Sequence, residues 1–336
     1  MGELPADSRG ADLPPPPPRL PDDLLVEILM RIPPEPIHLF RASVVSKHWR
    51  CLVHDARFLH RFRELHGGTP PLLGFFHPRG PPLFVPTSGG FALSTATITD
   101  DRWLYDCQHG RALLNSYRTG TLFVWDLMTG DERYLPLPAH ACIGNTGSWG
   151  EITSIQMQSS FISPKPTALI GNMLYWLLDD HSIIEFDLDK NSLDFVEEVP
   201  RLYDHIIVMP AEDGVLCFAG VDGLNLHLWS RVAGIDGVVT WTNHRVIDME
   251  KLLAPEVVAA CMVQEHGVDP IGYAEDADVI FIDVYPIIYM IHLKSMKIEE
   301  VSQKRISSHI FPYTSFYAPG ITTGCGDDRA ELLNNS

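Results

Sequence analysis

The sequence has few of the patterns that mark metal-binding, redox or common hydrolytic proteins. Its six cysteines lie far apart and form no Cys-x-x-Cys pair, which excludes the usual zinc-finger and thioredoxin-type motifs. It contains no G-x-S-x-G elbow, no P-loop and no H-E-x-x-H motif. We therefore expect free, mostly buried thiols in a reducing compartment, and no bound metal or cofactor.

Long apolar runs and an excess of basic residues are also missing. No stretch approaches the ~20 apolar residues of a membrane-spanning helix, and the first residues lack the apolar segment of a signal peptide. Lys and Arg number 25 against 43 Asp and Glu, so the formal net charge is −18. This charge argues against nucleic-acid binding, which needs a basic surface. We expect an intracellular protein of the cytoplasm or nucleus, not secreted and without a membrane partner.

What the sequence does have is a dense helical pattern close to its start. Leu24, Leu25, Ile28 and Leu29 fall on one stripe of a helix that begins near residue 21. Further helical patterns follow up to about residue 65, the last of them with Asp55 as its N-cap. Three or four short helices cannot bury so much apolar surface among themselves, so the segment predicts a protein partner.

From about residue 70 the pattern changes to short β-rich runs separated by Gly, Asp, Asn and Pro. Four segments share the order strand, turn, strand, turn, strand, and their equivalent strands start near Leu122, Ile183, Leu226 and Ile288. One interval, 43 residues, is close to the ~40–50 residues of a propeller blade, whereas the other two, 61 and 62, leave room for long loops or a decayed blade. We expect a propeller-like ring of six blades, because a ring buries both faces of each sheet.

These two patterns divide the chain into parts. The fold class is α+β multidomain, a small helical domain followed by an all-β, propeller-like domain. Residues 1–18 form a disordered Pro-rich tail, 19–66 the helical domain, 70–320 the β domain and 321–336 a flexible tail. The segment MEKLLAPEVVAA is expected to add one or two helical turns to the β domain.

The helical segment resembles the F-box over about residues 19–60. The residues that carry the resemblance, in the family's order and spacing, are Leu20-Pro21, Leu24, Ile28-Leu29, Ile32-Pro33, Val45, Lys47 and Trp49-Arg50. Ser46 stands where the family often has Cys, which replaces one small residue by another. Downstream phrases such as DCQHGRALL, FVWDLMTGD and PYTSFYAPG resemble plant F-box proteins with a C-terminal, β-propeller-like F-box-associated domain.

The resemblance implies a non-catalytic substrate-recognition subunit of an SCF-type ubiquitin ligase, which acts in ubiquitin-dependent protein degradation. Its F-box binds a Skp-type adaptor and, through it, a cullin and a RING protein, while the β domain holds an unidentified target. No catalytic, cofactor-binding or metal-binding residue is implied. The residues expected to contact the Skp adaptor are apolar positions of the helices: Leu20, Pro21, Leu24, Leu25, Ile28, Leu29, Leu39, Val45, Trp49 and Val53.

Three alternatives stay open at this point. The same apolar residues could be the core of a helical cap, and both roles can hold for different residues. The alternative function is a β-propeller ligand-binding protein or enzyme with a helical N-terminal cap, which predicts acids and histidines converging at one mouth of the ring. A third possibility is an F-box protein that binds the Skp adaptor without joining a cullin.

Several short patterns in the β region are better explained by ordinary structure than by a site. Trp125-Asp126 predicts a strand that ends in a turn, not a WD repeat. Asp179-Asp180-His181, and Asp276 with Asp278, predict turns because their spacing fits no EF-hand or zinc motif. Six aromatic residues are expected to pack in the core, with a ligand-binding platform as the alternative: Trp103, Tyr105, Trp125, Trp176, Trp229 and Trp241.

Overall fold

The computed structural model describes residues 20–34, 36–67, 69–78, 81–87, 101–116, 118–127, 131–135, 155–156, 160–196, 199–200, 202–211, 213–234, 237–263, 268–302 and 309–315. The predicted tails, 1–18 and 321–336, lie outside the described residues. No helix in the described part of the chain combines the length and the apolar character that crossing a bilayer requires.

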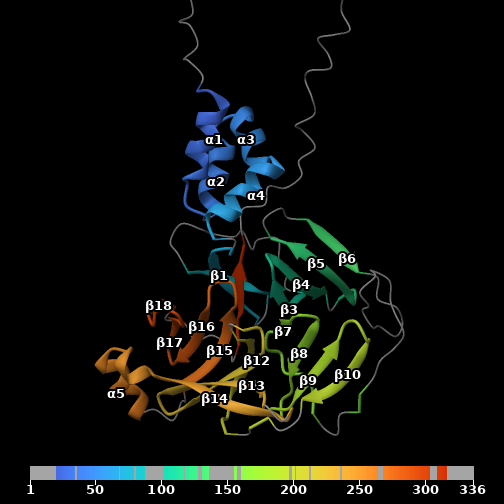
Figure 1. Ribbon diagram of the computed structural model, residues 1–336, viewed down its shortest axis with the longest axis vertical. Helices are drawn as coiled ribbons and strands as arrows, with labels where there is room; N and C mark the ends of the chain where they lie inside the picture. Colours follow the sequence, from blue (N-terminus) through green and yellow to red (C-terminus); the bar gives the residue numbers. More distant parts are fainter. Residues whose placement is uncertain are drawn as a thin grey trace, which may run out of the picture.

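The chain begins with a unit of four short helices, which lies outside a ring of β-sheets and beside one of its blades (Figure 1). The helices are α1 (Asp22–Met30), α2 (Pro36–Ser43), α3 (Lys47–His54) and α4 (Ala56–Leu65). Their ends are set by local hydrogen bonds. The Ser46 hydroxyl accepts from the amide of Trp49, and the Asp55 carboxylate accepts from the amides that open α4, as predicted for an N-cap.

The core of the helical unit is drawn from all four helices. Leu29 and Val53 are completely buried, and the Phe58 and Phe62 rings stack with centroids 5.8 Å apart. His66 follows α4, lies against the Phe62 ring at 4.4 Å between centroids, and its Nε2 lies 3.1 Å from the Met30 carbonyl oxygen. The unit therefore has a small apolar interior of its own.

The rest of the described chain forms five antiparallel sheets arranged as blades around an axis (Figure 1). The first blade comprises β1 (Leu72–His77), β2 (Leu83–Pro86) and β19 (Phe311–Thr314). The second blade comprises β3 (Arg102–Gln108), β4 (Arg111–Ser116), β5 (Thr121–Asp126) and β6 (Glu132–Leu135), and the third comprises β7 (Ala168–Ile170), β8 (Met173–Leu177), β9 (Ile183–Asp187) and β10 (Ser192–Val196). The fourth blade comprises β11 (Ile206–Pro210), β12 (Leu216–Asp222), β13 (Asn225–Ala233) and β14 (Val239–Asp248), and the fifth comprises β15 (Val268–Ala274), β16 (Val279–Val284), β17 (Ile287–His292) and β18 (Ile298–Ser302).

Within the described residues the ring has five blades, so the expectation of six is wrong. The intervals of 61 and 62 residues come from long connections between blades. The first spans the connection from β6, which ends at Leu135, to β7, which starts at Ala168. The second contains the short helix η2 (Met249–Lys251) and α5 (Pro255–Val263), which the sequence predicted as one or two turns. The fold class itself, a small helical region followed by an all-β propeller, is confirmed.

The two ends of the β region meet in the first blade. β19 pairs antiparallel with β1, with Phe75 opposite Pro312 and Phe76 opposite Phe311. Tyr313 in β19 is completely buried and meets the rings of Phe76 and Phe84, each with centroids 6.0 Å away. Because the last strand completes the sheet that the first strand begins, the ring is closed by hydrogen bonds and by an aromatic core.

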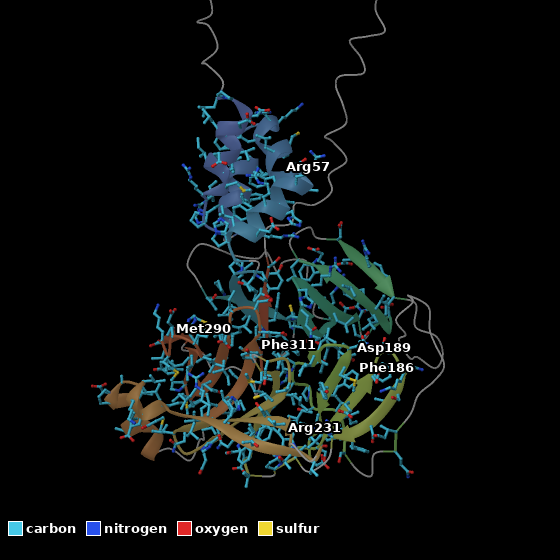
Figure 2. The ribbon with its side chains drawn as sticks, in the orientation of Figure 1. Arg57, Phe186, Asp189, Arg231, Met290 and Phe311 are labelled. Atoms are coloured by element: carbon cyan, nitrogen blue, oxygen red, sulfur yellow. The ribbon has the colours of Figure 1, made fainter. Side chains whose placement is uncertain are left out.

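The apolar cores lie mainly between neighbouring blades. The largest joins the inner faces of the fourth and fifth blades, and another joins the first and second. Figure 2 shows two core side chains, Met290 and Phe311, inside the propeller, whereas Arg57 projects from α4. Strands that are covered on both faces carry near-continuous apolar runs, as β11 and β16 do.

The predicted turns are confirmed. Trp125-Asp126 ends β5, and the Asp126 amide donates to the Asp131 carbonyl oxygen at 2.9 Å. The Asp180 carboxylate accepts from the Ser182 amide, and His181 and Asp278 have positive φ, as tight turns require. Of the six aromatic residues assigned to the core, Trp125 is buried, Trp176, Trp229 and Trp241 are half-buried, and Trp103 and Tyr105 are exposed, so the prediction is wrong for these last two.

Candidate functional site

The helical unit exposes an apolar stripe along α1. Leu24 and Ile28 are four residues apart, the spacing that places side chains on one face of a helix, and Leu20 lies just before the helix begins. Their exposed fractions are 51, 54 and 47 %. Isolated exposed apolar residues are common, but a row of them on a helix whose other face is buried is a pattern typical of interaction surfaces.

Further exposed apolar residues lie near the end of α2 and in the turn before α3. Phe40, Val44 and Val45 are all more than half exposed. His48 Nε2 lies 2.8 Å from an Asp22 carboxylate oxygen, which brings the start of α3 to the start of α1. Val45, three residues before His48, therefore lies near the start of α1, where the row of exposed apolar residues begins.

The structure separates the ten predicted contact residues into two groups. Pro21 and the exposed residues Leu20, Leu24, Ile28 and Val45 are accessible to a partner. Leu25, Leu29, Leu39 and Val53 are instead buried in the core of the helical unit, and Trp49 is half-buried against it. Phe40 and Val44 are accessible residues that the sequence did not single out, because they fall outside the F-box positions that carry the resemblance.

This division predicts different effects for two leucines of the same helix. Replacing Leu29 by Ala removes buried methyl groups, which costs about 2–5 kcal/mol of unfolding free energy. Replacing the exposed Leu24 by Ala should change it by about 0.5 kcal/mol or less. Hydrogen exchange of the α1–α4 amides measures both effects, and equal protection in the two variants would contradict the division.

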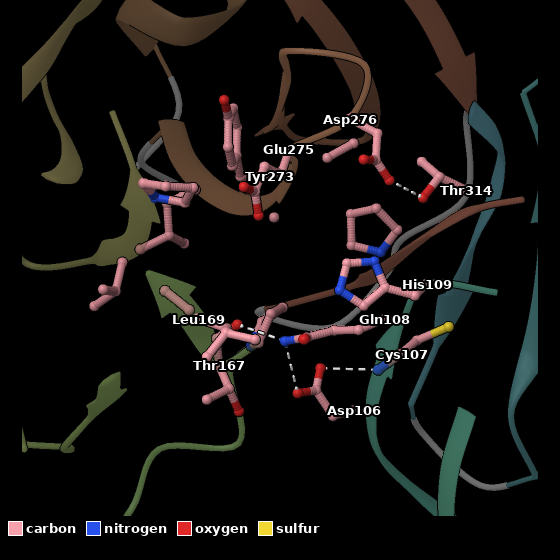
Figure 3. Close-up of a pocket in the computed structure, with 18 of the residues that line it drawn as sticks. Asp106, Cys107, Gln108, His109, Thr167, Leu169, Tyr273, Glu275, Asp276 and Thr314 are labelled. Carbon is pink, nitrogen blue, oxygen red and sulfur yellow. Dashed lines mark hydrogen bonds between the residues drawn. The ribbon is translucent and has the colours of Figure 1, made fainter. Parts of the chain in front are cut away.

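A second candidate site lies on the axis of the ring. A cavity of about 260 Å³ is lined by residues from all five inner strands, which are β3, β7, β11, β15 and β19. Asp106 and His109 come from the end of β3, and Glu275 and Asp276 directly follow β15 (Figure 3). His109 and Glu275 are exposed, so the mouth of the cavity lies at the carboxyl ends of these strands.

Hydrogen bonds fix several side chains of this cavity. Asp106 accepts from the Cys107 amide at 2.8 Å and from Gln108 Nε2 at 3.2 Å. The same Gln108 nitrogen donates to the Thr167 carbonyl oxygen at 3.0 Å, which ties the second blade to the third. Thr314 in β19 donates from its hydroxyl to Asp276 at 2.7 Å.

The cavity perturbs the ionisation of its acids. Burial raises the pKa of Asp106 to about 6, although hydrogen bonds from Cys107, Thr167 and Gln108 oppose the shift. Burial and then the neighbouring charge of Asp276 also raise the pKa of Glu275. Burial, with a smaller contribution from Asp106, holds the pKa of the Cys107 thiol well above its usual range. At neutral pH Asp106 is mainly ionised, whereas the Cys107 thiol stays protonated.

This cluster of acids with a histidine is what the ligand-binding or enzymatic alternative predicts. It lacks the pairing that nucleophilic catalysis needs, within the described residues. Cys107 is protonated and buried, and the His109 side chain has no hydrogen bond to a hydroxyl or thiol there.

The residues of this cavity were missed by sequence reasoning, which singled out only Asp276, and that as part of a turn. Two sequence segments could have indicated the cavity, DCQHG and YAEDAD, because each places polar residues at the end of a strand. Those strands, β3 and β15, were not recognised as the inner strands of their blades, so nothing indicated that the two phrases meet.

Two family models match the chain. The model "F-box domain" matches residues 17–61, and the model "F-box protein AT5G49610-like, beta-propeller" matches residues 139–320. None of the curated proteins matches the chain.

Several solved structures are similar to the chain at low identity. A nidogen/laminin complex shares 10 % identity over 73 % of this chain and 98 % of that one, with a TM-score of 0.34. The WD40 domain of SCAP from fission yeast shares 12 % identity over 65 % of this chain and 48 % of that one, with a TM-score of 0.30. YCF48 bound to D1 peptide shares 8 % identity over 76 % and 96 %, with a TM-score of 0.37.

Proposed function

Because the chain belongs to the family of F-box proteins with an AT5G49610-like β-propeller, we propose that it is a substrate-recognition adaptor of an SCF-type ubiquitin ligase. In this proposal residues 19–66 bind a Skp-type adaptor and residues 70–320 bind the target protein. The Skp adaptor links the chain to a cullin and a RING protein. The chain itself is non-catalytic.

The observation that carries the proposal is the apolar row formed by Leu24 and Ile28 on α1 and by Leu20 just before the helix. These side chains are about half exposed while Leu25 and Leu29 of the same helix are buried. An amphipathic helix with a second apolar row outside its own core is suited to a groove on a partner. Phe40, Val44 and Val45 extend the apolar surface beyond α1.

The connection between the two parts supports a role in positioning. His66, directly after α4, contacts the helical unit through Phe62 and Met30. At the other end, the Pro71 carbonyl oxygen accepts from the Ser315 amide at 3.3 Å, next to the closing strand β19. A short link anchored at both ends holds a target at a defined distance from the ubiquitin-loaded enzyme. The contribution to catalysis is then proximity.

The second candidate function is ligand binding by the ring with the helical unit as a cap. The acidic cavity on the axis is the observation that favours it. The two functions differ in what the helical unit does, because a cap needs no adaptor.

A plant origin and a location in cytoplasm or nucleus, which the sequence suggested, remain part of the adaptor proposal.

Assembly with the complete ligase tests the proposal. We expect the full chain to co-elute with a purified Skp–cullin–RING complex in gel filtration, with one chain per complex. The Skp adaptor alone, mixed with the chain, is the matched reference. Co-elution with the Skp adaptor but not with the complex would make the chain a scaffold that never joins a cullin, and the ligase assignment would be wrong.

A further inference from the structure

The size of the axial cavity limits what it can hold. Pockets for drug-sized ligands and cofactors have volumes of roughly 300–1,000 Å³, and this cavity has about 260 Å³. It opens at the carboxyl ends of β3 and β15, where His109 and Glu275 are exposed. A single long side chain of an approaching protein fits such a space better than a complete cofactor does.

Three hydrogen-bond donors of the cavity wall, the Gln108 amide and the hydroxyls of Thr314 and Tyr273, are already used within the wall. Both hydrogens of Gln108 Nε2 are engaged, with Asp106 and with the Thr167 carbonyl oxygen. The Thr314 hydroxyl donates to Asp276, and the Tyr273 hydroxyl donates to Asp278 at 3.0 Å. These donors are therefore not available to a guest.

Acceptors remain in excess. Within the described residues, the Glu275 side chain has no hydrogen bond and no ion pair, and the contact of Asp276 with Thr314 uses one of its two oxygens. Three carboxylates line the cavity, those of Asp106, Glu275 and Asp276, and neither Lys nor Arg lines it. Figure 3 shows these acids on opposite sides of the same space, with His109 between them.

A ligand that pairs with the free carboxylate oxygens of this cavity must have hydrogen-bond donors and a positive charge. The ammonium group of lysine has three donors and the guanidinium group of arginine has five, and neither has an acceptor. Hydrogen bonds from such groups to carboxylates are among the strongest in proteins. A phosphate or a carboxylate would instead meet three acids.

We propose that the axial cavity binds a cationic side chain, arginine or lysine, of a protein that docks on the ring; naming that protein as the ubiquitination target rests on the function proposed above. The cavity mouth suits this role. Thr314 lines the cavity, and the next residue, Ser315, donates to Pro71 in the link to the helical unit. The side chain would therefore be held at the end of the ring where that link enters.

Calorimetry with short peptides tests the inference on the full chain at pH 7.5, where Asp106 is mainly ionised. The probes are acetyl-Gly-Gly-X-Gly-Gly-amide with X as arginine, lysine or citrulline, since citrulline keeps the shape of arginine without its charge. We expect dissociation constants of about 1 mM or below for arginine and lysine. Citrulline should bind at least about tenfold more weakly. Equal binding of citrulline, or no binding of either cationic peptide at 5 mM, would overturn the inference.

Matched variants separate the cavity from the overall negative charge. Glu275→Gln with Asp276→Asn should weaken the cationic peptides at least about tenfold, while Asp106 is kept because it bonds the Cys107 amide. The control, Glu250→Gln with Glu256→Gln, removes the same charge from exposed residues of η2 and α5 and should leave affinity unchanged. Equal effects of both pairs would also overturn the inference.

The same protein preparations are tested for binding of the Skp adaptor. Adaptor binding without peptide binding would overturn the cavity assignment and leave the adaptor function intact. Peptide binding without adaptor binding would support the cavity and contradict the adaptor function. Thermal unfolding midpoints within a few degrees of the wild type verify that each variant is folded.

Discussion

A variant with Leu24→Asp and Ile28→Asp is expected to lose binding of the Skp adaptor by at least about 100-fold. Hot-spot residues near the centre of an interface cost about 2 kcal/mol or more when truncated, and an unpaired carboxylate buried against the partner adds to that cost. A total of about 3 kcal/mol corresponds to the 100-fold loss. Both side chains are about half exposed, so placing a carboxylate on them disturbs the partner contact more than the fold. Surface-immobilised adaptor and graded concentrations of the full chain provide the measurement.

The control for this variant is Arg57→Gln, which changes an exposed residue of α4 (Figure 2). The amide of Arg57 takes part in the Asp55 cap, but its side chain does not, so the helix is preserved. Adaptor binding should stay within about twofold of the wild type. If the double variant binds as the control does, the α1 stripe is not the contact surface. Trp49→Ala is a poorer test, since Trp49 packs against the core of the helical unit.

Replacing Tyr313 by Ala is expected to lower the free energy of unfolding of the propeller by about 3–5 kcal/mol. Tyr313 is completely buried and packs against Phe76 and Phe84 in the blade that closes the ring. The loss is a large fraction of the ~5–15 kcal/mol that stabilises a typical domain. A shift of the urea midpoint, followed by tryptophan fluorescence, reports it.

The matched control is Leu83→Ala in the same sheet, because Leu83 is about half exposed on β2. Its effect should be about 0.5 kcal/mol or less. Similar midpoints for the Tyr313 and Leu83 variants would show that the closing strand contributes little to stability. The closure described above would then be contradicted as the source of ring stability.

The helical unit was predictable from sequence because its signals are local. The spacing of Leu24, Leu25, Ile28 and Leu29 predicts a helix, and Asp55 is the N-cap that the sequence indicated. What local spacing does not decide is which of two adjacent apolar rows faces inward. Leu25 and Leu29 are buried while Leu24 and Ile28 are exposed, a division that only the packing of α1 against the other helices determines.

The sequence pattern indicated the blades but not their inner strands. The repeats recognised in the sequence correspond to the outer three strands of each four-stranded blade, such as β4, β5 and β6. Inner strands lie on the axis and lack an alternating pattern: β7 has three residues, and all five residues of β11 are buried. β15 contains Pro270 and Gly272, and β19 contains Pro312, and both residue types are unfavourable inside a strand.

The axial cavity could not be predicted either, because the inner strands that line it were not recognised. Its residues are contributed by strands distant in sequence, and only the closure of the ring brings Asp106 into the same cavity as Asp276 and Thr314. The rise in the pKa of Asp106 comes from burial, which the sequence does not report. Register shifts in β3 and β15, at Tyr105 and Ile271, further change which side chains face the axis.

The most direct test of the adaptor function is a pull-down with a tagged Skp adaptor. The full chain is compared with a chain that lacks residues 1–66, whose folding is verified by its urea midpoint. The proposed function predicts stoichiometric capture of the full chain and no capture of the shortened one. Equal capture of both, or failure of the folded full chain to bind, would contradict it and leave ligand binding by the propeller as the better assignment.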